Sequence, residues 1–101
     1  MQQTGQLQEA GAMTCRDITI INKLGMHARA SAKFVELANQ YGSTVTISRN
    51  GQTVNGKSIM GLMMLAAAKG TAVTVCADGD DEKIAVDGLC SLIDDYFGED
   101  E

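Results

Sequence analysis

Two short segments of this chain, residues 43–48 and 71–77, alternate apolar and polar side chains with a period of two. Val45 and Ile47 fall on one face of the first segment, and two valines fall on one face of the second. This pattern is typical of β-strands that bury one face and expose the other. A chain with such strands needs helices to cover the apolar face of its sheet.

Two further segments complete a set of four predicted strands. Residues 16–21 are rich in β-branched side chains, and residues 52–54 follow Asn50-Gly51, which is a strong signal for a hairpin turn. Because the two alternating strands are half-polar, we expect one face of the sheet to be exposed to solvent.

Three segments show the apolar spacing of helices. They are residues 28–41, residues 59–68, and a segment from Asp80 or Asp81 to about Phe97. Gly42 and Gly70 end the first two helices, and Ser58 is a good N-cap for the second. The order β-α-β-β-α-β-α predicts an α+β open-faced sandwich with its helices on one face of the sheet.

The same spacing predicts which helical side chains form the core. The stripe on the first helix is Ala30, Phe34, Leu37, Ala38 and Tyr41, and the stripe on the last is Ala85 or Val86, Leu89, Leu92 or Ile93, and Tyr96. The middle helix is expected to bury Leu62, Leu65 and Ala66. Its Ile59, Met60 and Met63 then lie near solvent, where methionines form an adaptable surface for a protein partner. A helix buried on all sides is the alternative.

Length and charge limit the possible function. The 101 residues suffice for one domain, with its site on the surface rather than in a deep cavity. Thirteen acidic against eight basic residues give a net charge of −5, without the basic stripe of a nucleic-acid-binding protein.

The sequence contains no run of about 18 apolar residues, so it predicts no membrane span. We expect residues 1–13 to be a flexible extension, with Met13 as an alternative start, and residues 99–101 to be a solvated acidic tail.

Cysteine content argues against a metal centre. The three cysteines, at positions 15, 76 and 90, show no C-x-x-C spacing, and a single histidine cannot complete a usual zinc set. We expect three reduced thiols, at least two of them in the core, as in a cytosolic protein. A catalytic cysteine–histidine pair is disfavoured because Cys76 and Cys90 fall at positions predicted to be buried, where thiols are inert.

The start of the first helix is the best candidate for chemistry. The first amides of a helix, here those of Ala28, Arg29 and Ala30, have no partner inside it, and the helix dipole makes this end positive. A phosphoryl group is stabilised at such a place without a cavity. His27 supplies a nucleophilic nitrogen there, and the guanidinium of Arg29 can contact phosphate oxygens. An ordinary cap or surface histidine is the alternative interpretation.

Two motifs together resemble the HPr family, the histidine phosphocarriers of the bacterial phosphotransferase system. They are residues 22–29 (Asn-Lys-Leu-Gly-Met-His-Ala-Arg) and residues 55–63 (Asn-Gly-Lys-Ser-Ile-Met-Gly-Leu-Met), each heading a predicted helix. The resemblance implies an HPr domain over residues 14–98, with a four-stranded antiparallel sheet and three helices on one face. It also implies a cytoplasmic monomer without cofactor or metal that is no enzyme in the strict sense.

The resemblance further implies roles for individual residues. His27 would accept a phosphoryl group on Nδ1 from phosphorylated Enzyme I and pass it to an Enzyme IIA domain in sugar transport, with Arg29 contacting the group. Ser58 would be the site of an HPr kinase/phosphorylase. Partner contacts would come from Met26, Ile59, Met60 and Met63.

One departure and two alternatives accompany the resemblance. Ala30 stands where the family usually has proline, which predicts a slightly looser helix start with one more free amide. The nitrogen-type paralogue, which feeds a regulatory relay instead of sugar transport, is the alternative function. A pure interaction protein without phosphate chemistry is disfavoured, because family members of that kind lack the active histidine.

Overall fold

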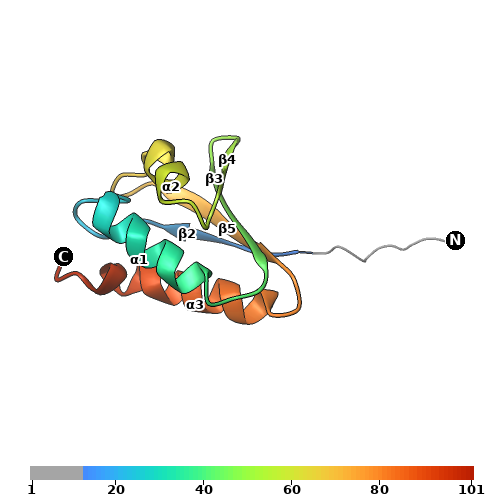
Figure 1. Ribbon diagram of the computed structural model, residues 1–101. Coiled ribbons are helices and arrows are strands. Elements are labelled where there is room, and N and C mark those ends of the chain that lie inside the picture. The colour runs from blue at the N-terminus through green and yellow to red at the C-terminus, as the bar shows by residue number, and fades with distance from the viewer. Residues whose placement is uncertain (1–12) are drawn as a thin grey trace, which may run out of the picture.

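The computed structural model describes residues 13–101, so nearly all of the predicted extension lies outside the described residues (Figure 1). Within this range, four strands and three α-helices follow the predicted order. They are β2 (Thr14–Thr19), α1 (Ala28–Ala38), β3 (Thr44–Arg49), β4 (Gln52–Asn55), α2 (Ile59–Leu65), β5 (Ala72–Asp78) and α3 (Glu82–Asp94), followed by the 3-10 turn η1 (Tyr96–Gly98).

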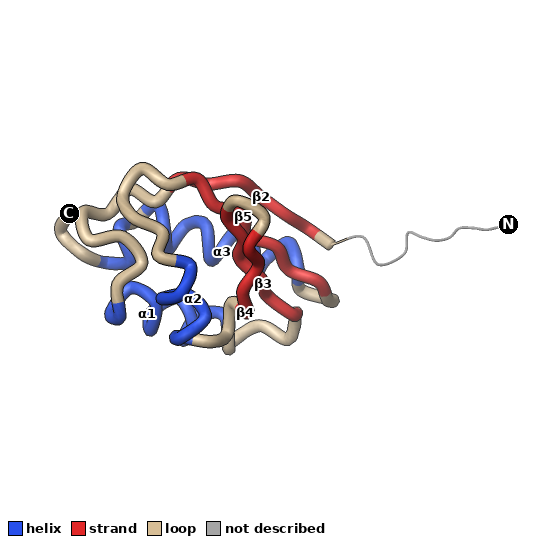
Figure 2. Tube along the Cα trace, turned by 90° about the horizontal axis from the view of Figure 1, so that it is seen from above, coloured by secondary structure: helices blue, strands red, loops and turns tan. Residues whose placement is uncertain are grey.

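The strands form one antiparallel sheet in the order β2-β5-β3-β4. Burial alternates along β3 and β5 as predicted, so that Val45, Ile47, Val73 and Val75 are all buried on one face. The helices pack on this apolar face and leave the other face open (Figures 1 and 2). The predicted α+β open-faced sandwich is therefore confirmed.

Each helix ends three residues before its predicted end, at Ala38, Leu65 and Asp94. The residues beyond these ends form tighter hydrogen bonds to the third residue back, such as Tyr41 N to Ala38 O at 3.1 Å and Ala66 N to Met63 O at 3.1 Å. Such bonds close a turn without continuing an α-helix. The apolar periodicity runs on through these turns, which is why it overestimates the helices.

Most of the predicted core is confirmed, and the errors lie at these helix ends. Tyr96 is 38% exposed while Phe97 is fully buried, because both residues have positive φ and the chain turns the next ring inward. Ala66 is exposed and Ala67 is buried, because Ala66 adopts a left-handed conformation that ends α2. On α1, Ser31 and Val35 are also buried, whereas Leu37, and Tyr41 in the turn after the helix, are partly buried against the core.

The prediction of three reduced thiols, at least two of them in the core, is wrong. Cys15 on β2 lies directly opposite Cys76 on β5, and the two form a disulfide. Period-two alternation puts Cys76 on the open face of the sheet, on the opposite side from its buried neighbour Val75. Only Cys90, on α3, is buried, and this burial raises the pKa of its thiol.

Candidate functional site

A tightly held loop carries His27 to the start of α1. Within it, Asn22 Nδ2 donates to the carbonyl oxygen of Gly25 at 2.8 Å. Gly25 has φ +67°, and a β-carbon there would lie 2.9 Å from Ala68 Cα and closer still to the carbonyl oxygen of Ala67. Only glycine fits both the conformation and the space. The loop geometry therefore fixes where the helix begins.

Met26, the residue before His27, anchors the loop from inside. Its side chain is only 4% exposed and belongs to the hydrophobic core. The expectation that Met26 contacts a partner is therefore wrong for the structure as it stands. The exposed apolar side chain of this loop is instead Leu24, at 67%.

His27 occupies the N-cap position of α1, but its side chain makes no capping hydrogen bond. Its carbonyl oxygen accepts the first helical hydrogen bond, from Ser31 N at 2.9 Å. Across residues 13–101, the amides of Ala28, Arg29 and Ala30 find no hydrogen-bond acceptor. Three donors at the positive end of the helix dipole are thus available to an anion.

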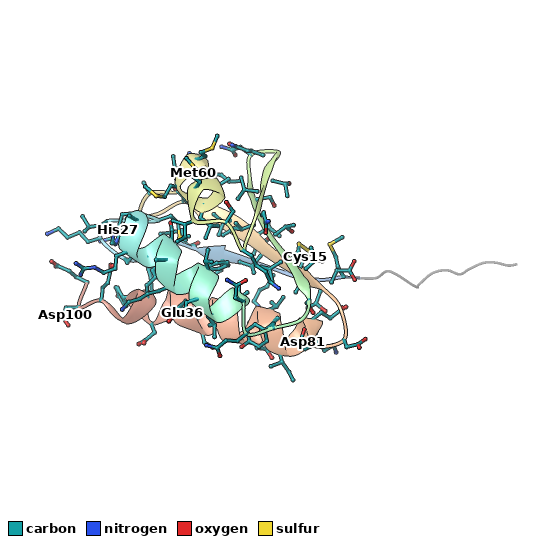
Figure 3. The ribbon with its side chains drawn as sticks, in the orientation of Figure 1. Cys15, His27, Glu36, Met60, Asp81 and Asp100 are labelled. Carbon is teal, nitrogen blue, oxygen red and sulfur yellow. A yellow bond between two sulfur atoms is a disulfide. The ribbon has the colours of Figure 1, made fainter. Side chains whose placement is uncertain are left out.

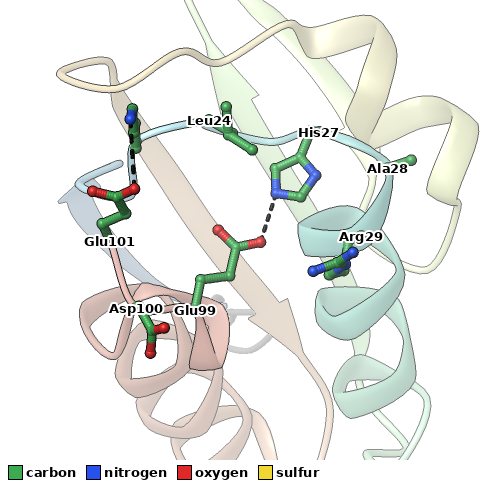
Figure 4. Close-up of a pocket in the computed structure, with 8 residues that line it drawn as sticks. Leu24, His27, Ala28, Arg29, Glu99, Asp100 and Glu101 are labelled. Atoms are coloured by element: carbon green, nitrogen blue, oxygen red, sulfur yellow. Dashed lines mark hydrogen bonds and ion pairs between the residues drawn. The ribbon is translucent and has the colours of Figure 1, made fainter.

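The imidazole lies in an open hollow between the start of α1 and the C-terminal segment (Figure 4). The His27 side chain is 26% exposed, so a large partner can reach it. Arg29 is exposed at the same hollow and makes no hydrogen bond or ion pair with any other residue in the described range. The hollow is lined by Lys23, Leu24, His27, Ala28, Arg29, Glu99, Asp100 and Glu101.

Glu99 is a site residue that the sequence did not indicate. Its Oε2 lies 2.6 Å from His27 Nε2, and its Oε1 accepts a hydrogen bond from Asn22 Nδ2 at 3.2 Å. Burial alone would raise the pKa of the Glu99 carboxyl, but the hydrogen bonds from Asn22 and His27 and the nearby guanidinium of Arg29 together lower this pKa below its ordinary value of 4.5. Its side chain is 13% exposed, so the prediction of a solvated tail is wrong for Glu99.

The second predicted motif forms a separate surface on α2. Ser58 caps this helix, since its Oγ accepts a hydrogen bond from Gly61 N at 3.0 Å. Leu62 and Leu65 are buried, whereas Ile59, Met60 and Met63 are 42%, 74% and 45% exposed. Met64 is exposed as well. We call Ile59, Met60 and Met63 the α2 patch.

Helix α2 packs against α1, and Figure 3 shows Met60 and His27 on the same side of the molecule. Ser58 stands at the opposite end of α2 from Ala67, the residue that contacts the His27 loop. Ser58 is not among the residues that line the His27 hollow. The two predicted phosphate positions are therefore distinct.

Two other kinds of site receive no support. In residues 13–101, no three His, Cys, Asp or Glu side chains gather as metal ligands. None of the helices described for this chain has the length and apolar character needed to cross a bilayer.

The fold and the hollow together define a small α+β protein with an accessible histidine beside the free amides of a helix start. The chain belongs to the HPr family: the family model described as "PTS HPr component phosphorylation site" matches residues 14–95. The family is a phosphocarrier component of the phosphotransferase system, as the resemblance of the two motifs implied.

Individual relatives agree with this assignment. Phosphocarrier protein HPr of Cupriavidus necator is 58% identical over 89 residues, which cover 88% of this chain and all of that protein. Phosphocarrier protein NPr of Shewanella violacea is 38% identical over 84 residues, which cover 83% of this chain and 92% of that protein. The crystal structure of HPr-C-His from Thermoanaerobacter tengcongensis superposes with a TM-score of 0.84 at 41% identity, covering 87% of this chain and 99% of that one.

Proposed function

We propose that His27 carries a phosphoryl group on Nδ1, taken from phosphorylated Enzyme I and passed to an Enzyme IIA domain in a sugar-transport relay. The single observation that supports this best is the placement of an accessible imidazole beside three free helix amides. Phosphoryl transfer needs mainly positioning and charge stabilisation, and a partner protein can supply part of both. The protein is then a carrier within a cytoplasmic chain of transfers and needs no cofactor of its own.

Arg29 is the proposed side-chain contact of the phosphoryl group. Its guanidinium is exposed at the hollow without an internal partner in the described range, so it can turn toward phosphate oxygens. The amides of Ala28, Arg29 and Ala30 are the proposed backbone contacts. The side chain of Ala30 is fully buried. Unlike a proline at this position, Ala30 has a backbone N–H, which is an additional donor for the phosphoryl group.

The α2 patch is the proposed docking surface for both Enzyme I and the acceptor. Its three exposed apolar side chains lie on α2, which packs against α1, the helix that follows His27. A phosphate on Ser58, added by an HPr kinase, would place about two negative charges next to this patch. Phosphorylation of Ser58 would therefore weaken docking of an acidic partner without touching the imidazole.

The nitrogen-type relay is the alternative. The Gly-Met-His-Ala-Arg sequence and the acidic C-terminus are compatible with it, whereas the motif around Ser58 favours the sugar branch. The identities of 58% to an HPr and 38% to an NPr do not favour the alternative. Side-by-side transfer assays with sugar-type and nitrogen-type IIA acceptors distinguish the two branches.

The proposed function is tested by incubating the chain with Enzyme I and phosphoenolpyruvate labelled in its phosphate. We expect one acid-labile, base-stable phosphate per chain in the wild-type protein and none in His27→Ala. Incubation with ATP and a bacterial HPr kinase should add an acid-stable phosphate that Ser58→Ala does not take. Full labelling of the His27→Ala protein by Enzyme I would refute the assignment of the carrier residue.

A further inference from the structure

Glu99 approaches His27 on one ring nitrogen only. Its Oε2 lies 2.6 Å from Nε2, and Figure 4 shows the other nitrogen on the side of Ala28 and the start of α1. A carboxylate is an acceptor without a proton to donate, so the proton of this hydrogen bond belongs to Nε2. A neutral imidazole with its proton on Nε2 has its free lone pair on Nδ1.

The Glu99 carboxylate is itself held in place. Asn22 Nδ2 donates both to its Oε1 at 3.2 Å and to the carbonyl oxygen of Gly25 at 2.8 Å. One amide group thus ties the carboxylate to the loop that presents the imidazole. Because its side chain is 13% exposed, the hydrogen bond to His27 is partly shielded from water.

The neighbouring charges single out Glu99 within the acidic tail. Glu101 pairs instead with Lys23 Nζ at 3.5 Å, and both of these side chains are largely exposed. Glu99 lies beyond residues 14–95, the part of the chain that the family model matches. The charged groups that line the hollow around the imidazole are Lys23, Arg29, Glu99, Asp100 and Glu101.

We propose that Glu99 is a positioning residue for the proposed phosphoryl transfer, which fixes the Nε2–H tautomer of His27 and keeps that proton in place while Nδ1 is phosphorylated. This inference rests on the proposed function for the identity of the transferred group. It adds a carboxylate that acts through the imidazole, because Glu99 contacts Nε2 and the phosphoryl group is transferred at Nδ1.

The phosphoryl transfer step does not require the Nε2 proton of His27 to move. The Nδ1 lone pair attacks phosphorus, the new P–N bond forms, and the bond from phosphorus to the donor atom breaks, with its electron pair leaving on the donor. Nε2 keeps its proton, so the phosphorylated ring is a cation that faces the Glu99 anion. In onward transfer the P–N electron pair returns to Nδ1, and the ring leaves as neutral imidazole. A ring that loses the Nε2 proton is a poorer leaving group.

The first test reads the tautomer and needs no phosphoryl donor. The chain contains one histidine, so the full-length protein labelled with ¹⁵N in histidine gives one imidazole spectrum. We expect the wild-type ring to be a single Nε2–H tautomer at pH 8. Glu99→Ala should shift it toward the tautomer mixture shown by free histidine, and Glu101→Ala should leave it unchanged. A Glu99→Ala spectrum identical to the wild-type one overturns the proposal.

The second test measures how the rate of transfer from phosphorylated His27 to an Enzyme IIA acceptor depends on pH. The rate should fall at high pH, as Nε2 loses its proton, and in Glu99→Gln this fall should occur about half to one pH unit lower. Glu99→Asp, which keeps the charge, should restore part of the shift, and Glu101→Gln should behave as wild type. Superimposable profiles for wild type and Glu99→Gln would overturn the proposed role.

The two tests separate this inference from the proposed function. If the wild-type chain takes no phosphoryl group, the proposed function fails, and the tautomer spectra still decide whether Glu99 fixes the ring. If the chain is phosphorylated normally and neither readout responds to Glu99, only the present inference fails. Circular dichroism of each variant establishes that the comparison is made between folded proteins.

Discussion

The amide of Met26 donates a hydrogen bond to the carbonyl oxygen of Ala67 at 2.9 Å, so the loop that presents His27 rests on the residues that end α2. Gly25, immediately before Met26, packs against the same carbonyl oxygen, where a β-carbon has no room. The candidate site and the α2 patch are therefore connected through backbone atoms, which are less adaptable than side chains.

This connection predicts that Gly25→Ala lowers the free energy of unfolding more than an ordinary glycine-to-alanine substitution does. The variant must adopt positive φ and also displace the backbone at Ala67, so we expect about 2 to 3 kcal/mol lower free energy of unfolding and slower phosphoryl uptake. Gly51→Ala is the matched control, since Gly51 has φ +80° but open space around it. The control should lose about 1 kcal/mol and keep its uptake rate. Urea unfolding and Enzyme I labelling check both values, and equal behaviour of the two variants contradicts the argument.

The sequence predicted the fold well because the signals involved are local. Alternation of Val45 with polar neighbours, the Asn50-Gly51 turn and the Ser58 cap each specify structure within a few residues. His27 was also identifiable, since a histidine at a predicted helix start and a second motif at the right separation coincide. The errors at Tyr96 and Ala66 arise where positive φ at non-glycine residues redirects the chain, and periodicity carries no sign of that.

Contacts between distant segments were the part that could not be predicted. Glu99 reaches His27 across 72 positions, and nothing near Glu99 in sequence distinguishes it from the other acidic residues of the tail. Cys15 and Cys76 pair across 61 positions, and their pairing depends on the register of β2 against β5. Strand register follows from the complete sheet, whereas each strand alone predicts only its faces.

If partners dock on the α2 patch, Met60→Glu should lose phosphoryl uptake without losing its fold. Met60 is 74% exposed, so the charge should not disturb folding, but it opposes burial against a partner. We expect kcat/KM for uptake from Enzyme I to fall about tenfold or more, mainly through KM. Ile84→Glu is the control, because Ile84 is 65% exposed on α3. An equal effect of both variants would argue against a docking role for the patch.

Ser58 allows its capping role and its proposed regulatory role to be separated. Ser58→Ala removes the acceptor for Gly61 N and should lower the free energy of unfolding by about 1 kcal/mol. Ser58→Asn retains a capping acceptor without charge, and Ser58→Asp retains one with a charge that favours a helix start. We therefore expect both to be more stable than Ser58→Ala in urea unfolding, while only Ser58→Asp slows uptake. Equal uptake by Ser58→Asn and Ser58→Asp would exclude a charge effect.

The disulfide predicts redox-dependent stability without redox-dependent transfer. A bridge across 61 positions restricts the unfolded chain, so reduction should lower the free energy of unfolding by about 2 to 4 kcal/mol. Cys15 and His27 lie toward opposite ends of the molecule in Figure 3, so uptake should not change. Unfolding and labelling of the wild-type chain with and without dithiothreitol check this, with Cys15→Ser as a variant that stays open. A loss of uptake on reduction would show that the bridge supports the site.

The most direct test of the proposed function locates the phosphoryl group on the imidazole ring. The chain, labelled with ¹⁵N in its one histidine, is phosphorylated by Enzyme I and phosphoenolpyruvate and examined for coupling between ³¹P and ¹⁵N. We predict a one-bond coupling to Nδ1 of His27, the nitrogen on the side of the free amides of α1. Coupling to Nε2, or a phosphorylated chain with no coupling to either nitrogen, would contradict it.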